Sequence, residues 1–337
     1  MVLWIVRHGR RGEYEEFALQ NNLVSIDWGS LPNLSDLQDK EQLRNIIHDT
    51  YPEESPNTLS NWFGQIRSFL HRIEIGDLVG IPLRTRSAIA FGVVQSDYQY
   101  EPDNPEGARH IRKVEWLETD MSKTLLPSDI LQSLSSHLTV FGVRRPRAAE
   151  RIRGLIGGET EDDVEIGDDE EIDDLSTSID VQEYATNTIV QFISERYRGH
   201  ELTRLVAGVL EAKGYTVNTS LGGPDGGVDI LAGSGQMGFD SPRIAVQVKS
   251  SDHPAGARDI RDLKGTFDDF NAELGLFVSW GGFKDSVLRD ERKGFFQIRF
   301  WDADDLVREL LLVYERLPDE LKAEIPLKRV WTLVEDE

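Results

Sequence analysis

Three stretches of the C-terminal half combine residue types and spacing that suit chemistry at a phosphate group. Glu201 lies in the first turn of a predicted helix, the segment GGPDGGVDI spans residues 222–230, and the segment AVQVKSS spans residues 245–251. The glycines of the second stretch permit a tight turn, after which Asp229 opens a strand. Carboxylates such as Glu201 and Asp229 are ligands for hard divalent cations. These stretches predict a site built from neighbouring strands and one helix.

The third stretch places two polar side chains on one face of an apolar strand. Side chains alternate along a strand, so Gln247 and Lys249 project together while Val246 and Val248 point to the opposite face. Burying charge is costly unless it is paired or bound to a metal ion. Either motif alone has an ordinary explanation, because D-G-G is a common turn and Q-x-K occurs on solvent-facing strands. Their combination with Glu201 favours a nuclease site.

Metal-dependent hydrolysis of phosphodiester bonds assigns a role to each of these residues. Mg²⁺ or Mn²⁺ takes carboxylate oxygens together with water and phosphate oxygens. We expect Asp229 to anchor the cation, Glu201 to reach it from its helix, and Gln247 to contribute its carbonyl oxygen. Lys249 would orient or activate the attacking water and offset the charge that grows on the phosphate. Ser250 is a further candidate, because its hydroxyl or backbone N–H can bind phosphate.

Taken in order, these elements resemble the catalytic domain of the Mrr-type restriction endonucleases, within the PD-(D/E)xK nuclease superfamily. The family pattern is an acidic residue in the first helix, then G-x-D-G-G-[VI]-D and then Q-V-K, matched here by Glu201, residues 223–229 and residues 247–249. The later stretch GLFVSWGGF at 275–283 is similar to that family's apolar strand and glycine-rich turn. The resemblance covers about 198–312 and implies that the Asp, Gln and Lys of these motifs form the catalytic core.

Helices and strands alternate through the region that must position these residues. Apolar residues at helical spacing predict a helix that Gly214 ends. Strands are expected at 215–219, 228–232, 243–249, 274–280 and 296–301, and helices at 181–197, 199–214, 256–271, 284–293 and from 304 onward. This alternation predicts an α/β/α sandwich around a mixed sheet with a partly parallel centre.

The N-terminal half is mostly β in pattern. Strands are expected at 3–9, 24–29, 77–83, 88–100 and 110–117, with helices at 36–49 and 58–72. The strands containing G-D-L-V and G-x-V-x-x-x-Y-x-Y resemble PUA-like and EVE-like domains over about residues 1–120. The resemblance implies a small β-barrel that reads a modified base or nucleotide flipped out of a helix. The chain is therefore predicted to be an α+β protein of two domains.

A flipped base needs flat aromatic faces and hydrogen-bonding groups at its edge. We expect Trp28 and Trp62 to sandwich the base, Asn22 or Asp27 to read its edge, and Tyr98 to line the same site. The alternative is that these aromatic side chains are ordinary core residues.

Arginines of the same half offer a second kind of contact. Arg84 and Arg86 could form a phosphate-binding rim, or they could equally lie on a solvated surface.

The segment between the halves is strongly acidic. Residues 151–180 carry 2 basic and 12 acidic side chains, a net charge of −10 out of −23 for the whole chain. Such a run repels itself and has few apolar residues to hold it down, which predicts an extended linker. The alternative is a DNA-mimicking tail that covers a basic groove. The predicted organisation is a recognition domain at 1–150, a linker at 151–180 and a nuclease domain at 181–337.

Composition limits the classes that remain. The chain has no cysteine, which excludes disulfides, thiolate zinc sites and cysteine nucleophiles and fits a reducing cytoplasm. The apolar start is too short for a signal peptide, and no run approaches the roughly 18 apolar residues of a membrane span. A soluble, cytoplasmic protein without a membrane partner is expected. The net charge argues against a nucleic-acid partner, although nearly half of it lies in the acidic segment.

These observations favour a restriction endonuclease directed at modified or foreign DNA, with Mg²⁺ or Mn²⁺ as cofactor. Cutting both strands requires two active sites, so a homodimer or transient pairing on DNA is expected. Two alternatives stay open. One is an effector nuclease that is switched on by a small nucleotide bound to the N-terminal half, and the other is a nucleic-acid-binding module that has lost activity.

Overall fold

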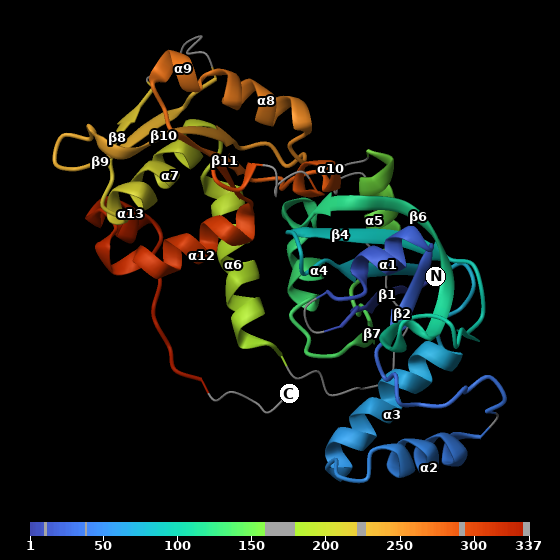
Figure 1. The fold of residues 1–337 in the computed structure, drawn as a ribbon. Coiled ribbons are helices and arrows are strands. Elements are labelled where there is room, and N and C mark those ends of the chain that lie inside the picture. Colours follow the sequence, from blue (N-terminus) through green and yellow to red (C-terminus); the bar gives the residue numbers. More distant parts are fainter. Residues whose placement is uncertain (10–11, 38, 159–178, 221–226, 290–293, 333–337) are drawn as a thin grey trace. The chain divides into compact units, whose positions relative to one another are not determined.

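The chain divides into two compact units in a computed structural model (Figure 1). The structure describes residues 1–9, 12–37, 39–158, 179–220, 227–289 and 294–332. The N-terminal unit is Met1–Gln191 and the C-terminal unit is Phe192–Glu337. Within the described ranges, every helix is too short or too polar to cross a membrane.

The N-terminal unit is built on a seven-stranded sheet in the order β2-β6-β4-β3-β1-β7, with β5 paired to β6. β1 runs parallel to β3, and the other ladders are antiparallel. The strands are β1 (Leu3–Val6), β2 (Leu23–Ile26), β3 (Leu78–Pro82), β4 (Ala88–Val94), β5 (Gln99–Tyr100), β6 (His110–Ser122) and β7 (Val140–Gly142). No ladder joins β2 to β7 among the described residues, so the sheet is open where the sequence predicts a closed barrel.

Buried apolar residues lie on both faces of this sheet, and helices contribute to the cluster on each face. Along β1, Leu3 and Ile5 pack with α4 and α5, whereas Trp4 and Val6 pack with α2 and α3. A strand buried on both faces belongs to a layered α/β arrangement. The helices are α1 (Glu15–Gln20), α2 (Lys40–Thr50), α3 (Pro56–His71), α4 (Ser128–Ser133), α5 (Ala148–Gly157) and the first part of α6 (Val181–Arg196).

The two predicted N-terminal helices are present as α2 and α3. Ser55 caps α3 by accepting a hydrogen bond from the Thr58 N–H, and Pro56 occupies the first turn. Helices α1 and α4 span six residues each, which is too short to give a periodic signal. Helix α5 lies largely inside the predicted linker.

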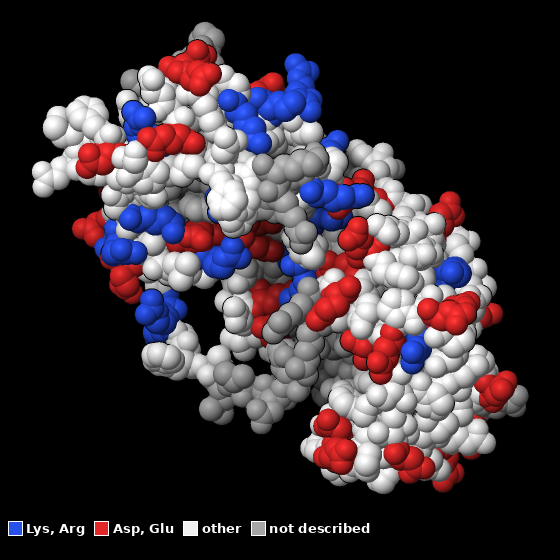
Figure 2. Space-filling model, viewed as in Figure 1, with Lys and Arg blue, Asp and Glu red and all other residues white. Residues whose placement is uncertain are grey.

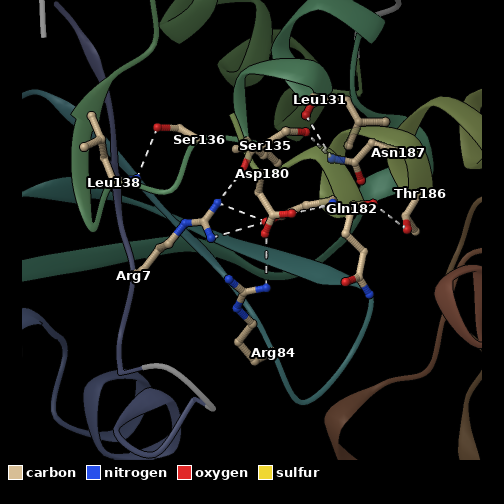
Figure 3. A network of polar contacts seen from close by, with 12 residues as sticks. Arg7, Arg84, Leu131, Ser135, Ser136, Leu138, Asp180, Gln182, Thr186 and Asn187 are labelled. Carbon is tan, nitrogen blue, oxygen red and sulfur yellow. Dashed lines mark hydrogen bonds and ion pairs between the residues drawn. The ribbon is translucent and has the colours of Figure 1, made fainter. Parts of the chain in front are cut away.

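A buried ion pair fixes the start of α6 to the N-terminal unit (Figure 3). The Arg7 guanidinium lies 3.2 Å from the Glu183 carboxylate, and Arg84 approaches the same carboxylate at 3.8 Å. Asn187 donates to the Ser135 hydroxyl at 3.1 Å, one helical turn further along. Burial lowers the pKa of Arg7, and Glu183 opposes that shift. The first half of α6 is therefore part of this unit.

The acidic segment is flanked on both sides by the N-terminal unit. Before it, Ile152 of α5 is fully buried in the core of this unit. After it, the Asp180 N–H donates to the Ser135 carbonyl at 2.7 Å. Residues 159–178 lie outside the described residues. The two compact units meet inside α6, between Gln191 and Phe192.

The C-terminal unit has the predicted mixed sheet, in the order β12-β11-β10-β9-β8. β10, β11 and β12 are parallel, whereas β8–β9 and β9–β10 are antiparallel. The strands are β8 (Thr216–Thr219), β9 (Ile230–Ser234), β10 (Asp240–Lys249), β11 (Leu274–Ser279) and β12 (Ile298–Trp301). Each lies within or next to an expected strand.

Helices lie over both faces of this second sheet (Figure 1). α7 and α12 cover one face, and α8 and α9 cover the other. The helices are α7 (His200–Ala212), α8 (Ala257–Gly265), α9 (Phe267–Phe270), α10 (Asp285–Arg289), α12 (Ala303–Val313) and α13 (Asp319–Glu324). The helix expected at 256–271 is divided at Thr266, and Gly214 follows α7 at a φ of +97° as expected of a helix-ending glycine.

The two arginines around Glu183 predict a contrast in stability. The Arg7 side chain is 10% exposed and the Arg84 side chain is 41% exposed. Removing one partner of a buried pair costs about 3–5 kcal/mol, whereas exposed pairs contribute about 1 kcal/mol or less. We expect Arg7→Met to destabilise the N-terminal unit strongly and Arg84→Met only slightly, as measured by chemical denaturation. Equal losses would contradict the assignment.

Candidate active site

Asp229 lies against the backbone of β10. Its N–H donates to the Val246 carbonyl at 2.8 Å, and the Val248 N–H donates to its Oδ2 at 2.7 Å. Because Ile230 pairs with Val246 in the antiparallel ladder, continuing the register places Asp229 opposite Gln247. Its carboxylate is thus held at the backbone N–H of Val248, which lies between Gln247 and Lys249 in the strand.

Gln247, which lies opposite Asp229, has a side-chain amide oxygen that could serve as a second ligand. Its Oε1 is buried and has no hydrogen-bond partner among the described residues. An added Cβ at Gly227, where φ is +87°, would lie 3.7 Å from Gln247 Nε2, so this turn passes close to the amide. An amide oxygen in this position is a suitable ligand for a hard divalent cation.

Lys249 is paired with an acid that the sequence did not single out. Its Nζ lies 3.4 Å from Oδ2 of Asp259 in the first turn of α8, and both side chains are about one-third exposed. Partial burial raises the pKa of Asp259, but the Gly256 N–H and the Lys249 ammonium outweigh it and lower the pKa overall. The capping sequence G-A-R-D was the available signal for this residue.

Ser279 is a second residue that sequence reasoning missed. It pairs in register with Lys249 in the parallel ladder of β10 and β11, so both side chains share a face. The residue is fully buried, and its hydroxyl has no partner among the described residues. It sits at the end of an apolar strand, where a serine carries no distinct signal.

The loops after β10 and β11 fasten this end of the sheet. The Trp280 N–H donates to the Lys249 carbonyl at 2.8 Å, and the Gly281 N–H donates to the Ser251 carbonyl at 3.0 Å. A Cβ at Gly281 would lie 2.4 Å from the Asp252 carbonyl carbon, so only glycine permits this approach. Ser250, the expected phosphate contact, lies partly buried in the loop directly after Lys249.

Glu201 is engaged elsewhere. Its carboxylate lies 2.8 Å from Arg204, which also pairs with Glu324, and the Glu201 side chain is 54% exposed. No hydrogen bond or ion pair joins it to Asp229, Gln247 or Lys249 in the described part of the chain. The structure therefore brings three of the four expected catalytic residues together.

The oxygen atoms of Asp229 and Gln247 suit a hard divalent cation that takes only a few of its ligands from the protein. Asp229 supplies a carboxylate and Gln247 a buried amide oxygen, while water and phosphate oxygens can complete the shell of Mg²⁺. The described residues contain no group of three or more acidic or histidine side chains able to hold a metal ion. Residues 221–226, most of the glycine-rich loop, lie outside them.

The expected base-binding aromatic residues form part of the N-terminal core. The Trp28 and Trp62 rings meet edge to face, with centroids 6.2 Å apart and planes at 66°, and Trp28 is only 7% exposed. Two rings in this contact leave no parallel gap for a base. Tyr51 makes a similar contact with Trp62 at 5.1 Å.

The polar residues expected beside them are separated. Asn22 precedes β2 and Asp27 follows it, so roughly 16 Å of extended chain lies between them. Asn22 has a φ of +52°, a turn conformation that asparagine tolerates. Asp27 is in contact with solvent, and partial desolvation of its carboxyl together with the charges of Glu13 and Glu106 raises the pKa of this group.

Tyr98 is partly buried and packs against the N-terminal core. Its hydroxyl lies 2.8 Å from Nδ1 of His110 and accepts the Leu34 N–H at 3.3 Å. Burial raises the pKa of Tyr98 to about 12.

The expected phosphate contacts Arg84 and Arg86 both have acidic partners. Arg84 approaches Glu183, and Arg86 lies 2.6 Å from Asp120 with a side chain only 8% exposed. Arg86 is therefore a structural residue of this unit, while Arg84 keeps part of its side chain in solvent.

Comparisons with known proteins agree with the geometry of the C-terminal unit. Residues 194–310 match the Mrr catalytic family model, described as restriction endonuclease. Residues 4–140 match a domain of unknown function (DUF8426). No curated protein matches the chain significantly.

Two solved structures are similar to the chain at low overall score. The DNA modification-dependent restriction endonuclease AspBHI is 14% identical with a TM-score of 0.33, over 81% of this chain and 74% of that one. The MspJI restriction endonuclease in complex with a 27-mer oligonucleotide is 12% identical with a TM-score of 0.30, over 97% of this chain and 80% of that one.

The donor set predicts stabilisation by a divalent cation. At about 100 times its dissociation constant, a ligand that binds only the folded state stabilises it by about 2.7 kcal/mol. We expect Mn²⁺ to raise the melting temperature of the C-terminal unit in calorimetry, and Asp229→Asn to remove the shift. Asp268→Asn, an exposed acid on α9, should keep it. An unchanged shift in Asp229→Asn would rule out this ligand.

Two buried histidines predict an acid-dependent loss of stability in the N-terminal unit. Burial lowers the pKa of His8 to about 3 and that of His110 to about 4, from 6.5. Only the unfolded chain gains these protons below pH 6.5, so stability is full above that pH and falls as the pH drops toward 4. The slope is up to about 1.4 kcal/mol per pH unit for each histidine.

Denaturation at several pH values checks this. His110→Asn should flatten the slope between pH 6 and 4 relative to the native chain, whereas His48→Asn, with a side chain 71% exposed, should leave it unchanged. Parallel slopes for all three proteins would refute the assignment.

Proposed function

We propose that the chain is a metal-dependent DNA endonuclease of restriction type that hydrolyses phosphodiester bonds in modified or foreign DNA. The observation that carries the proposal is the Val248 N–H bond to Asp229 Oδ2, which holds the carboxylate between Gln247 and Lys249. This arrangement lies inside the segment that matches the restriction endonuclease model.

In this proposal Asp229 and Gln247 hold Mg²⁺ or Mn²⁺ through their oxygens. When bound, the cation polarises the phosphate and lowers the pKa of a water molecule. Lys249 orients that water and offsets charge on the phosphate. The water oxygen bonds to phosphorus, the bond from phosphorus to a deoxyribose oxygen breaks, the water loses a proton, and the departing oxygen gains one. Ser279 and Ser250 offer hydroxyls beside Lys249.

The charge distribution is compatible with DNA as substrate. Residues 181–337 carry 19 basic and 27 acidic side chains, far less imbalance for their length than the segment 151–180. On the face shown in Figure 2, Lys and Arg side chains are interspersed with Asp and Glu over the C-terminal unit. Phosphate binding depends on local basic groups more than on net charge.

We propose that the N-terminal unit selects the DNA, through a surface that differs from the aromatic sandwich expected from the sequence. Trp62 and Tyr51 are partly exposed and in edge contact, and Asp27 influences the pKa of Tyr51 through its charge. An aromatic edge beside a carboxyl with a raised pKa suits a base that needs both stacking and a hydrogen bond. Two such chains would pair on DNA to cut both strands.

Substitution of the core residues tests the activity. We expect Asp229→Ala or Lys249→Ala to lower the rate of plasmid cleavage with Mg²⁺ by at least about 100-fold, because each removes stabilisation made at the reacting phosphate. Both variants should keep the circular dichroism of the native protein, and Lys249→Ala should also keep its melting temperature, whereas Asp229→Ala should melt somewhat earlier because the Val248 N–H loses its acceptor. Cleavage at the native rate by either variant would remove that residue from the site.

The ion pair of Asp319 and Lys322 on α13 supplies matched controls. These residues form an ion pair with each other at 2.8 Å, with Asp319 97% exposed and Lys322 31% exposed, so Asp319→Ala and Lys322→Ala repeat the charge changes away from the proposed site and should cleave normally. Comparing plasmid with and without modified bases, and with and without added nucleotides, separates the alternatives. Cleavage only after nucleotide addition indicates an effector nuclease, and tight binding without any cleavage indicates an inactive module.

A further inference from the structure

We propose that Asp259, in the first turn of α8, is the positioning residue for Lys249 in the cleavage reaction. The inference rests on the proposed function, because it assigns Asp259 a role that is exerted through Lys249. The observation is the contact between Lys249 Nζ and Asp259 Oδ2 at 3.4 Å. It joins the last residue of β10 to the first turn of α8.

Asp259 is held in place independently of Lys249. Its Oδ2 accepts the Gly256 N–H at 2.7 Å, which closes the N-terminal cap of α8. Ile260 and Leu263 of the same helix are buried against the sheet. The carboxylate therefore belongs to a rigid element, and it can define where the lysine ammonium lies.

Lys249 needs such an anchor. A lysine is a point charge on a flexible four-carbon stem, and this side chain is about one-third exposed. Productive geometry requires catalytic groups to be held within about 0.5 Å by supporting contacts. Among the described residues, Asp259 is the side chain that makes an ion pair with Lys249.

A substitution to asparagine separates this role from helix capping. In Asp259→Asn the amide oxygen can still accept the Gly256 N–H, but the charge that holds Lys249 is gone. Asp262→Asn is the matched control, because Asp262 lies on the same helix, is 66% exposed and contacts Arg258 at 3.7 Å. Both variants lose one negative charge from α8.

We expect Asp259→Asn to lower kcat for plasmid cleavage roughly 10- to 100-fold, as a misplaced group does, with KM, DNA affinity and melting temperature unchanged. Asp259→Glu, which keeps the charge, should recover part of kcat. In protein without metal, acylation of Lys249 mapped by mass spectrometry should be several-fold faster in Asp259→Asn. Asp262→Asn should match the native protein in every measurement.

The outcomes are separable. Native kcat and native Lys249 acylation in Asp259→Asn would overturn the inference while leaving the nuclease intact. A loss of kcat that follows a fall in melting temperature, and that Asp259→Glu does not recover, would overturn it in favour of a structural cap. Normal cleavage by Lys249→Ala would instead remove the proposed site, and the inference with it.

Discussion

The hydrogen bond from the Val248 N–H to Asp229 Oδ2 is the contact on which the candidate site depends. It ties a side chain directly before β9 to the backbone of β10, between Gln247 and Lys249 of that strand. A slip of one residue would turn Gln247 and Lys249 to the opposite face. β10 resists such a slip because it is paired on both sides, with β9 antiparallel and β11 parallel. The central position of β10 therefore sets the chemistry.

A second constraint comes from the way the N-terminal sheet is covered. β1 is buried on both faces, in one apolar cluster that includes residues of α2 and α3 and in another that includes residues of α4 and α5, so α5 is part of the core of this unit. The chain on both sides of the acidic segment is thereby drawn into this unit. The ion pair of Arg7 and Glu183 fixes the chain to this unit after the acidic segment. The two compact units meet within α6, between Gln191 and Phe192.

The sequence was sufficient where local patterns and tertiary structure agree. Alternation in residues 243–249 and the apolar stretch 274–280 predicted β10 and β11, and the glycine turn before Asp229 pointed to its neighbour. It failed where long-range packing decides. The edge strand β7 has only three residues, too few to give an alternating pattern in the sequence. The sequence therefore did not distinguish a closed barrel from a sheet that ends at this strand. The contact between Asp259 and Lys249 depends on how the loop after β10 folds back, which the sequence does not indicate. Glu201 was selected for its position in the first turn of a helix, but its carboxylate pairs with Arg204.

The ligand set has an electrostatic consequence of its own. With one carboxylate and one neutral amide, Asp229 and Gln247 would leave a divalent cation with a larger net positive charge than two carboxylates would. Lys249 adds a further positive charge beside it. A phosphate group would be attracted strongly to this position, even in a chain with a net charge of −23, because local charges dominate at short distance. The Asp259 carboxylate partly offsets the charge of the lysine, since its Oδ2 lies 3.4 Å from Lys249 Nζ and accepts the Gly256 N–H at the cap of α8. In the proposed site, a bound cation and Lys249 would together concentrate positive charge where a phosphate binds, and Asp259 would hold the flexible lysine side chain in place.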